Sequence, residues 1–276
     1  MSGLGKTVAV LAGGVSGTYV AGMTGSASQT PLVGSTIAAD TARDYDVYVI
    51  GSGIIQVVNS HGFLRTYAGT GVSGYSGDGG LATAAQLSSP GWPGIAVGPA
   101  GALYVFDNGN NVIRRIDFVT KIITRVAGTP NQDIPNFGTG NGGSALLAVL
   151  SKTLLGQIAV SSLSEIYFLA DKGIQKIDAA GVLSIVCGNQ TVPMPVNADG
   201  DGGLATAINC DGSIQGVALD DAGKILYVTH NGWSKIRAID LTTNIITTAI
   251  GNGINNPKIP GLGGPAVDGM LFLHTS

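Results

Sequence analysis

The sequence contains an internal repeat, which limits the folds open to this chain. The string GDGGLATA occurs at residues 77–84 and again, unchanged, at 200–207. A longer match joins LYVFDNGNNVIRRIDFVTKIITRVAG at 103–128 to LYVTHNGWSKIRAIDLTTNIITTAIG at 226–251. A third copy lies at 166–188 and a weaker one at 47–69. The unit recurs about every 60 residues, a period typical of stacked repeat architectures.

Each unit predicts four short strands. The second strand carries a tyrosine, and a glycine closes the fourth; these residues are Tyr48, Tyr104, Tyr167 and Tyr227, with Gly69, Gly128, Gly188 and Gly251. Alternation places Leu103 and Val105 on one face of a strand and Tyr104 and Phe106 on the other. Turns rich in Gly, Asn and Asp predict antiparallel neighbours.

One four-stranded sheet cannot bury both of its faces, whereas copies stacked around an axis can, as in a β-propeller. A β-sandwich is the alternative, but it does not explain the period. We therefore predict an all-β fold of four complete four-stranded antiparallel blades in a single domain spanning 1–276. The units are 14–69, 70–128, 129–188 and 189–251, with partial blade elements at 1–13 and 252–276. A chain with 44 glycines and 11% charged residues fits such a turn-rich β protein.

The segment SGDGGLATAAQLSSPGWPGIAVGPAGALYVFDNGNNVIRRIDFVTKIITRVAGT at 76–129 strongly resembles a blade of the NHL-repeat β-propeller family. The resemblance covers nearly the whole chain and is most specific for the second and fourth units. It implies a rigid disc whose loops bind partners, commonly with six blades. In a minority of relatives it implies a metal-dependent enzyme.

The repeated string GDGGLATA joins the fourth strand of one unit to the first strand of the next. We expect its glycines to adopt positive φ, and Asp78 and Asp201 to bind nearby backbone amides. Leu81 and Leu204 are expected to enter the groove between blades. Related strings at other joints favour a structural role over phosphate or calcium binding, since the remaining ligands of such loops are missing.

Three residues at the end of second strands are candidate metal ligands: Asp107, Asp171 and His230. The resemblance implies that enzymatic relatives hold a metal in the central channel with such side chains. Gly51 interrupts the column, which favours instead that Asp107 and Asp171 brace the following turn. No nucleophile elbow or zinc-ligand spacing is found. We predict no catalytic residue and no cofactor, with a metal-dependent hydrolase or lyase as the alternative.

Other polar and aromatic residues have simpler interpretations. A column at the end of the third strands predicts turn-forming side chains, namely Asn59, Asp117, Asp178 and Asp240. Arginines on the third strands are expected on solvated faces: Arg114, Arg115 and Arg237. Trp92 and Trp233 lie in loops, where they are candidates either for contact with a protein or glycan partner or for packing between blades.

Several signals favour the outside of a cell. Cys187 and Cys210 flank one connection between blades, and predict either a disulfide or two buried thiols. Asn189 begins the glycosylation triplet NQT. A net charge of −3 with 14 scattered basic residues lacks the basic patch of a nucleic-acid-binding protein, and no apolar run is long enough to span a membrane. We predict an extracellular or surface scaffold that binds protein or glycan partners.

The two ends of the repeat predict an incomplete set of blades. The segment TVAVLAG, ending at Gly13, looks like a fourth strand without the first three, and GGPAVDGMLFLHTS stops where another first strand should begin. An open end exposes an apolar blade face and a strand edge. We expect either that the chain is part of a longer one or that another copy covers this end, in the extreme case as a filament.

Overall fold

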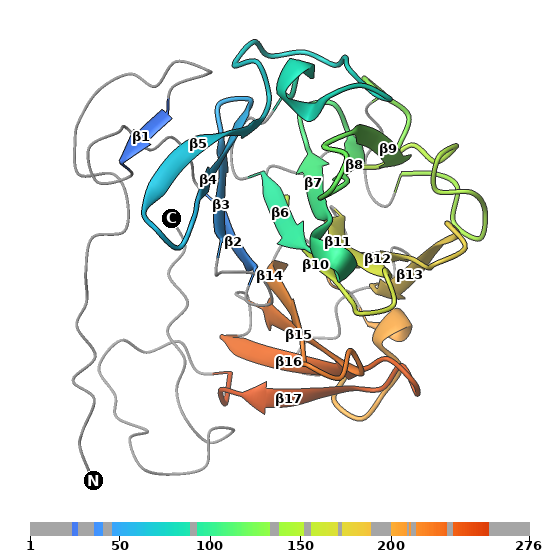
Figure 1. The fold of residues 1–276 in the computed structure, drawn as a ribbon. Coiled ribbons are helices and arrows are strands. Elements are labelled where there is room, and N and C mark those ends of the chain that lie inside the picture. The colour runs from blue at the N-terminus through green and yellow to red at the C-terminus, as the bar shows by residue number, and fades with distance from the viewer. Residues whose placement is uncertain are drawn as a thin grey trace, which may run out of the picture.

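The computed structural model describes residues 24–26, 36–40, 46–88, 93–132, 138–151, 156–170, 173–188, 200–208, 210, 214–230 and 234–253. Almost all regular structure in these residues is β-strand. Four antiparallel sheets form a four-bladed β-propeller, with successive sheets arranged around a common centre (Figure 1). The predicted all-β propeller is confirmed.

Each blade contains four consecutive strands in sequence order, and the first strand of each blade lies innermost (Figure 1). Blade 1 consists of β2 (Thr36–Asp40), β3 (Asp46–Gly51), β4 (Ile54–Val58) and β5 (Phe63–Ala68). Blade 2 consists of β6 (Gly94–Val97), β7 (Leu103–Asp107), β8 (Val112–Ile116) and β9 (Ile123–Ala127). Blade 3 consists of β10 (Ile158–Val160), β11 (Ile166–Ala170), β12 (Gly173–Ile177) and β13 (Leu183–Cys187). Blade 4 consists of β14 (Ile214–Leu219), β15 (Ile225–His230), β16 (Lys235–Asp240) and β17 (Ile246–Ile250).

Alternating side chains bury both faces of an inner blade, as the sequence predicts. In β7, Leu103 and Val105 join an apolar cluster with blade 1, whereas Tyr104 and Phe106 join a second cluster with blade 3. Phe106 packs edge to face on Phe168, with ring centroids 5.7 Å apart. Such pairs prefer this geometry because the ring edge is positive and the ring face negative. The core is therefore a set of apolar layers between blades.

The connections between blades pair with the outermost strand of the blade that they enter. The Gly79 amide donates to the Ile123 carbonyl at 2.8 Å, and the Ile123 amide donates to the Gly80 carbonyl at 3.0 Å. Isolated bridges pair Leu81 with Ile122, Ser144 with Val182, and Leu204 with Ile245. In blade 1 this place is taken by β1 (Thr24–Ser26), where Ser26 pairs with Phe63. Each connection thus pairs with an outer strand that would otherwise present an open edge.

The leucines of the repeated string do not enter the groove between blades. Leu81 and Leu204 are exposed, whereas their neighbours Ala82 and Ala205 are fully buried. Because successive side chains of an extended segment point in opposite directions, burying each alanine turns the adjacent leucine outward. The expectation that these leucines are buried was wrong.

The closing glycines are required by their backbone conformation, with φ of 88° at Gly69, 87° at Gly128, 108° at Gly188 and 91° at Gly251. A Cβ atom at Gly128 would lie 2.2 Å from the carbonyl oxygen of Asn111. The Gly128 amide donates to the Ala145 carbonyl at 2.9 Å, which fixes the start of the next connection. Glycine is the residue that combines this left-handed conformation with so close an approach of two backbones.

Candidate functional site

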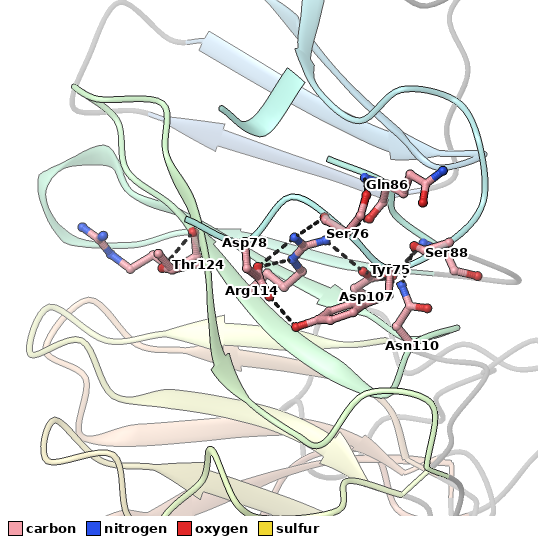
Figure 2. A network of polar contacts seen from close by, with 11 residues as sticks. Tyr75, Ser76, Asp78, Gln86, Ser88, Asp107, Asn110, Arg114 and Thr124 are labelled. Atoms are coloured by element: carbon pink, nitrogen blue, oxygen red, sulfur yellow. Dashed lines mark hydrogen bonds and ion pairs between the residues drawn. The ribbon is translucent and has the colours of Figure 1, made fainter. Parts of the chain in front are cut away.

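A buried arginine organises the polar residues of blade 2 (Figure 2). The Nη2 atom of Arg114 donates to Asp78 Oδ1 at 2.7 Å, and Nε donates to the same oxygen at 3.0 Å. Two carbonyl oxygens complete its hydrogen bonds, Gln86 at 2.9 Å from Nη1 and Ser76 at 2.8 Å from Nη2. Arg114 lies on β8, whereas its partners lie in the connection from blade 1. The side chain therefore fastens the connection to the blade.

The prediction that Arg114 and Arg237 lie on solvated faces was wrong, since both are fully buried. Arg114 lies beside a break in the pairing register of β8 and β9, between Ile113 and Arg114. Such bulges re-aim side chains. The folded connection then covers the guanidinium and supplies a carboxylate and carbonyls in place of water. Arg115, which has no such cover, keeps a partly exposed ion pair with Asp117 at 3.1 Å.

Tyr75 closes the network on its other side. Its hydroxyl donates to Asp78 Oδ2, and its ring centroid lies 5.1 Å from the Arg114 guanidinium carbon. Burial and the hydrogen bond to the Asp78 carboxylate raise the pKa of Tyr75 to about 12. The Asp78 carboxylate thus binds two side chains in place of the backbone amides that the sequence suggested.

The same clamp recurs in blade 4, where Arg237 Nη2 donates to Asp201 Oδ1 at 2.7 Å. In blade 3 the corresponding residues are Asn141 and Gln175. Gln175 is buried, and its amide atoms make no hydrogen bond with the described residues. The acidic residue of the connection and the arginine of the third strand are therefore present together or absent together. This pairing accounts for the unchanged Asp in the two copies of GDGGLATA.

Asp107 serves the same network from the end of β7. One carboxylate oxygen accepts the Ser88 amide at 2.8 Å, the other accepts Asn110 Nδ2 at 2.8 Å and lies 3.6 Å from Arg114 Nη1. Burial raises the pKa of this carboxyl to about 6, although the hydrogen bonds and Arg114 act in the opposite direction. With both oxygens engaged, Asp107 braces the turn that follows its strand.

Of the other two candidate metal ligands, the structure describes His230. His230 is buried at the end of β15, where its backbone is paired with Ile214 of β14 and with Lys235 of β16. Asp171 lies outside the described residues, as do Trp92, Trp233 and Asn189. Within the described residues, no three His, Cys, Asp or Glu side chains are grouped as a metal site would require.

The column at the end of the third strands forms turns, as predicted. Asp117 Oδ1 accepts the amides of Val119 at 3.0 Å and Thr120 at 2.9 Å. These hydrogen bonds, with that from Thr120 first, lower the pKa of Asp117 to about 2. The equivalent acceptors elsewhere are Asn59, Asp178 and Asp240, each of which binds amides of its own turn.

A pocket of about 370 Å³ opens between blades 2 and 3, where the connection between these blades crosses. Its lining includes Tyr104, Arg125, Leu146 and Asp178. Arg125 donates through Nη1 to the carbonyl oxygens of Gly128 and of Leu146, the latter at 2.7 Å. Its Nε and Nη2 groups make no hydrogen bond with the described residues. The pocket thus combines apolar surface with free guanidinium donors.

This pocket was not predicted from the sequence. A signal was present, because Arg125 is the one charged residue in its column of the repeat. The other units carry Thr66, Ile185 and Thr248 at the same distance before the closing glycine. A departure from the repeat marks a position where the common blade structure does not dictate the side chain.

The two cysteines lie together at the junction of blades 3 and 4. The structure joins Cys187, the last residue of β13, to Cys210 by a disulfide, with their Cα atoms 6.7 Å apart. That separation lies within the range of protein disulfides. Both side chains are buried in the apolar cluster between these blades. The pair links the outer strand of one blade to the segment that leads into the next.

Comparison with known proteins gives likeness in fold. No protein-family model and no curated protein match the sequence. A structural genomics protein of unknown function from Bacteroides thetaiotaomicron VPI-5482 is 17% identical, with a TM-score of 0.56 over 88% of this chain and 53% of that chain. A streptogramin B lyase is 14% identical, with a TM-score of 0.43 over 77% of this chain and 52% of that chain. An auxiliary nutrient binding protein from the same Bacteroides strain is 15% identical, with a TM-score of 0.43 over 80% of this chain and 58% of that chain.

The chain spans little more than half the length of these proteins. At such low identity the likeness shows the fold alone, and one fold hosts many unrelated functions. Within the described residues, no helix has the length and apolar character needed to span a bilayer. The chain is a four-bladed β-propeller.

Proposed function

We propose that the protein is a non-catalytic binding module that takes a carboxylate-bearing protein or glycan partner in the pocket between blades 2 and 3. The observation that carries this proposal is the hydrogen bonding of the Arg125 side chain. Its Nη1 is fixed by the carbonyls of Gly128 and Leu146, while its remaining donors face no described acceptor. A fixed guanidinium fork suits a carboxylate because it offers two parallel hydrogen bonds.

The surroundings of Arg125 suit such a ligand. Leu146 is exposed beside it and offers apolar contact. The wall of the pocket also includes the turn of Asp178, whose Oδ1 is held by the amides of Ala180 and Val182 at 2.9 Å each. A wall fixed in this way loses little conformational freedom on binding, which favours affinity. The resemblance to NHL-repeat propellers supports the same role, because it implies a rigid disc that binds partners through its loops.

A titration with defined ligands tests this proposal. The probes are oligosaccharides rich in uronic acid and short peptides with a free C-terminal carboxylate, with amidated peptides as the uncharged comparison. We expect binding by isothermal titration calorimetry to weaken at least about tenfold in Arg125→Gln. Arg65→Gln removes an exposed arginine of blade 1 and serves as the matched control. Equal binding by both variants, or no binding of any carboxylate probe, would contradict the proposal.

We also propose that the protein lies outside the cell, either at the surface or secreted. The Cys187–Cys210 pair supports this location, since disulfides persist in oxidising compartments. Glycosylation at Asn189 belongs to the same proposal. Mass measurement after alkylation of protein from its native compartment checks both, and two labelled thiols or an unmodified Asn189 would remove that part of the support.

The alternative from the sequence, a hydrolase or lyase with a metal in the channel, is tested separately. Elemental analysis of the purified protein measures bound zinc and calcium. If the protein binds a stoichiometric metal and the His230→Ala variant does not, the metal-dependent enzyme would be favoured over the binding module.

A further inference from the structure

The three junctions between consecutive blades share one design. A tyrosine of the second strand packs toward the first strand of the next blade. Tyr48 shares a cluster with Ile95, Tyr104 with Ile158, and Tyr167 with Val217. The three tyrosines are 0%, 4% and 1% exposed. This interface is therefore a property of the repeat.

The corresponding face of blade 4 is uncovered. Tyr227, the fourth member of the tyrosine column, is 38% exposed. Ile250, which precedes the closing glycine, is 36% exposed, whereas its counterparts Ala68, Ala127 and Cys187 are buried. Blade 4 thus presents the tyrosine half of the interface to solvent. We call this the Tyr227 face.

The complementary half is uncovered on blade 1. Ile37 of β2 corresponds to Ile95 and Ile158, which are 5% and 8% exposed, yet Ile37 is 68% exposed. The inner strands pack in the order β2, β6, β10 and β14. Among the described strands, β14 does not pack on β2 in the way that β10 packs on β6. We call the exposed side of β2 the Ile37 face.

We propose that the Tyr227 face of one copy of this chain binds the Ile37 face of a second copy, head to tail. Continuity with the internal interface carries the proposal, because the chain exposes both halves of a junction that it already forms three times. In a pair of copies related by a twofold axis, each copy covers the exposed faces of the other. The proposal uses no residue of the Arg125 pocket, so the two stand or fall separately.

Self-association of the full chain is the first test. Light scattering with size exclusion, repeated over a range of protein concentrations, should show a species of two copies. Tyr227→Arg and Ile37→Arg should each weaken association at least about tenfold, because each puts a charge into a junction that buries apolar side chains. Val119→Arg changes an exposed residue in the turn between β8 and β9 and should leave association unchanged. Circular dichroism of each variant checks that the blades remain folded.

A mixture of the two variants tests the head-to-tail geometry. A Tyr227→Arg copy keeps its Ile37 face, and an Ile37→Arg copy keeps its Tyr227 face, so together they form one native junction. We expect the mixture to dimerise although neither variant does alone. A mixture that stays monomeric, or a Val119→Arg chain that also dissociates, would overturn the proposal.

Cross-linking distinguishes a second copy from closure within one chain. In the double variant Ile37→Cys/Tyr227→Cys, a short bismaleimide should give a covalent dimer whose yield rises with protein concentration. A monomeric product linked within one chain would show that the ring closes on itself. A monomer without any cross-link would show that neither face has the proposed partner. Either result would overturn the proposal.

Discussion

Several polar side chains of this propeller are buried, so their hydrogen bonds are made with the protein. Asp107, Arg114 and Gln175 are all buried polar side chains, and each has a different degree of hydrogen bonding. The sequence predicted correctly that Asp107 braces a turn and that Asn59 and Asp117 form turns, because these interactions are local. It failed for Arg114, whose acidic partner lies in a preceding connection. Side chains that meet only through tertiary packing have no local signature.

The raised pKa of Asp107 predicts a pH dependence of folding stability. Its folded pKa of about 6 lies above the ordinary aspartate pKa of 3.8, so the folded state binds the proton more tightly. The stability that this group contributes is therefore present at low pH and is lost as pH rises through 6. The free energy of unfolding of Asp107→Asn, measured relative to wild type, should therefore rise by up to about 3 kcal/mol as the pH increases from 4 to 7. Urea unfolding at several pH values measures this difference, and a constant difference would show that the pKa is not raised.

Substitutions at two glycines can distinguish the cost of backbone strain from the cost of steric contact. Gly128 has φ of 87° and a Cβ there would lie 2.2 Å from the Asn111 oxygen, whereas Gly79 has φ of 83° and nothing within 4 Å. Gly79→Ala should lower the free energy of unfolding by about 1–2 kcal/mol, which is the strain of the left-handed conformation alone. Gly128→Ala should cost clearly more, because two backbones must also move apart. Equal losses in thermal or urea unfolding would contradict this.

The connections between blades act as structural elements of their own. Each one pairs with the outer strand of the blade that it enters, and in blades 2 and 4 an Asp–Arg clamp holds it there. The sequence predicted the place of GDGGLATA between blades. It could not assign the partner of Asp78, since 36 residues separate it from Arg114. The joint change to Asn141 and Gln175 in the third unit was the signal that could have shown this.

A double-mutant cycle measures the clamp of blade 2. Arg114→Gln and Asp78→Asn should each destabilise the protein by about 1–3 kcal/mol, because each removes the charge-assisted hydrogen bonds of the other residue, while Asp107 stays 3.6 Å from Arg114. The double variant recreates the pair found in blade 3 and should lose less than the two single losses combined, with a coupling energy of about 1–3 kcal/mol. The exposed pair Arg115–Asp117 is the control, where coupling should stay below about 1 kcal/mol. Additive losses at Asp78 and Arg114 would show that they do not act as a pair.

At the scale of the molecule, blades are held together by apolar layers, and the junction of blades 3 and 4 carries a disulfide as well. The sequence predicted four blades from the period, and the structure confirms them. Its single-domain boundaries and its partial blade elements at 1–13 and 252–276 stay predictions, since of these two segments the structure describes only Asn252 and Gly253.

Loss of the disulfide should loosen this junction. Cys187→Ala/Cys210→Ala should unfold at lower urea concentration than the wild type, with a loss of roughly 3 kcal/mol, because the bond restricts the unfolded chain. Treatment of the wild type with a reducing agent should reproduce the effect and leave the double variant unchanged. A reductant effect on both proteins, or on neither, would contradict the assignment.

The fold class, the number of blades, the strand order and the turns follow from the sequence, because they depend on period, alternation and residues close in the chain. Tertiary structure alone decided that Arg114 is buried, that Leu81 is exposed and that Arg125 faces a pocket. It also decided that Tyr227 and Ile37 lack the cover given to their counterparts. The physical reason is that a repeat specifies what every blade shares, whereas burial of one side chain depends on which segment packs against it in three dimensions.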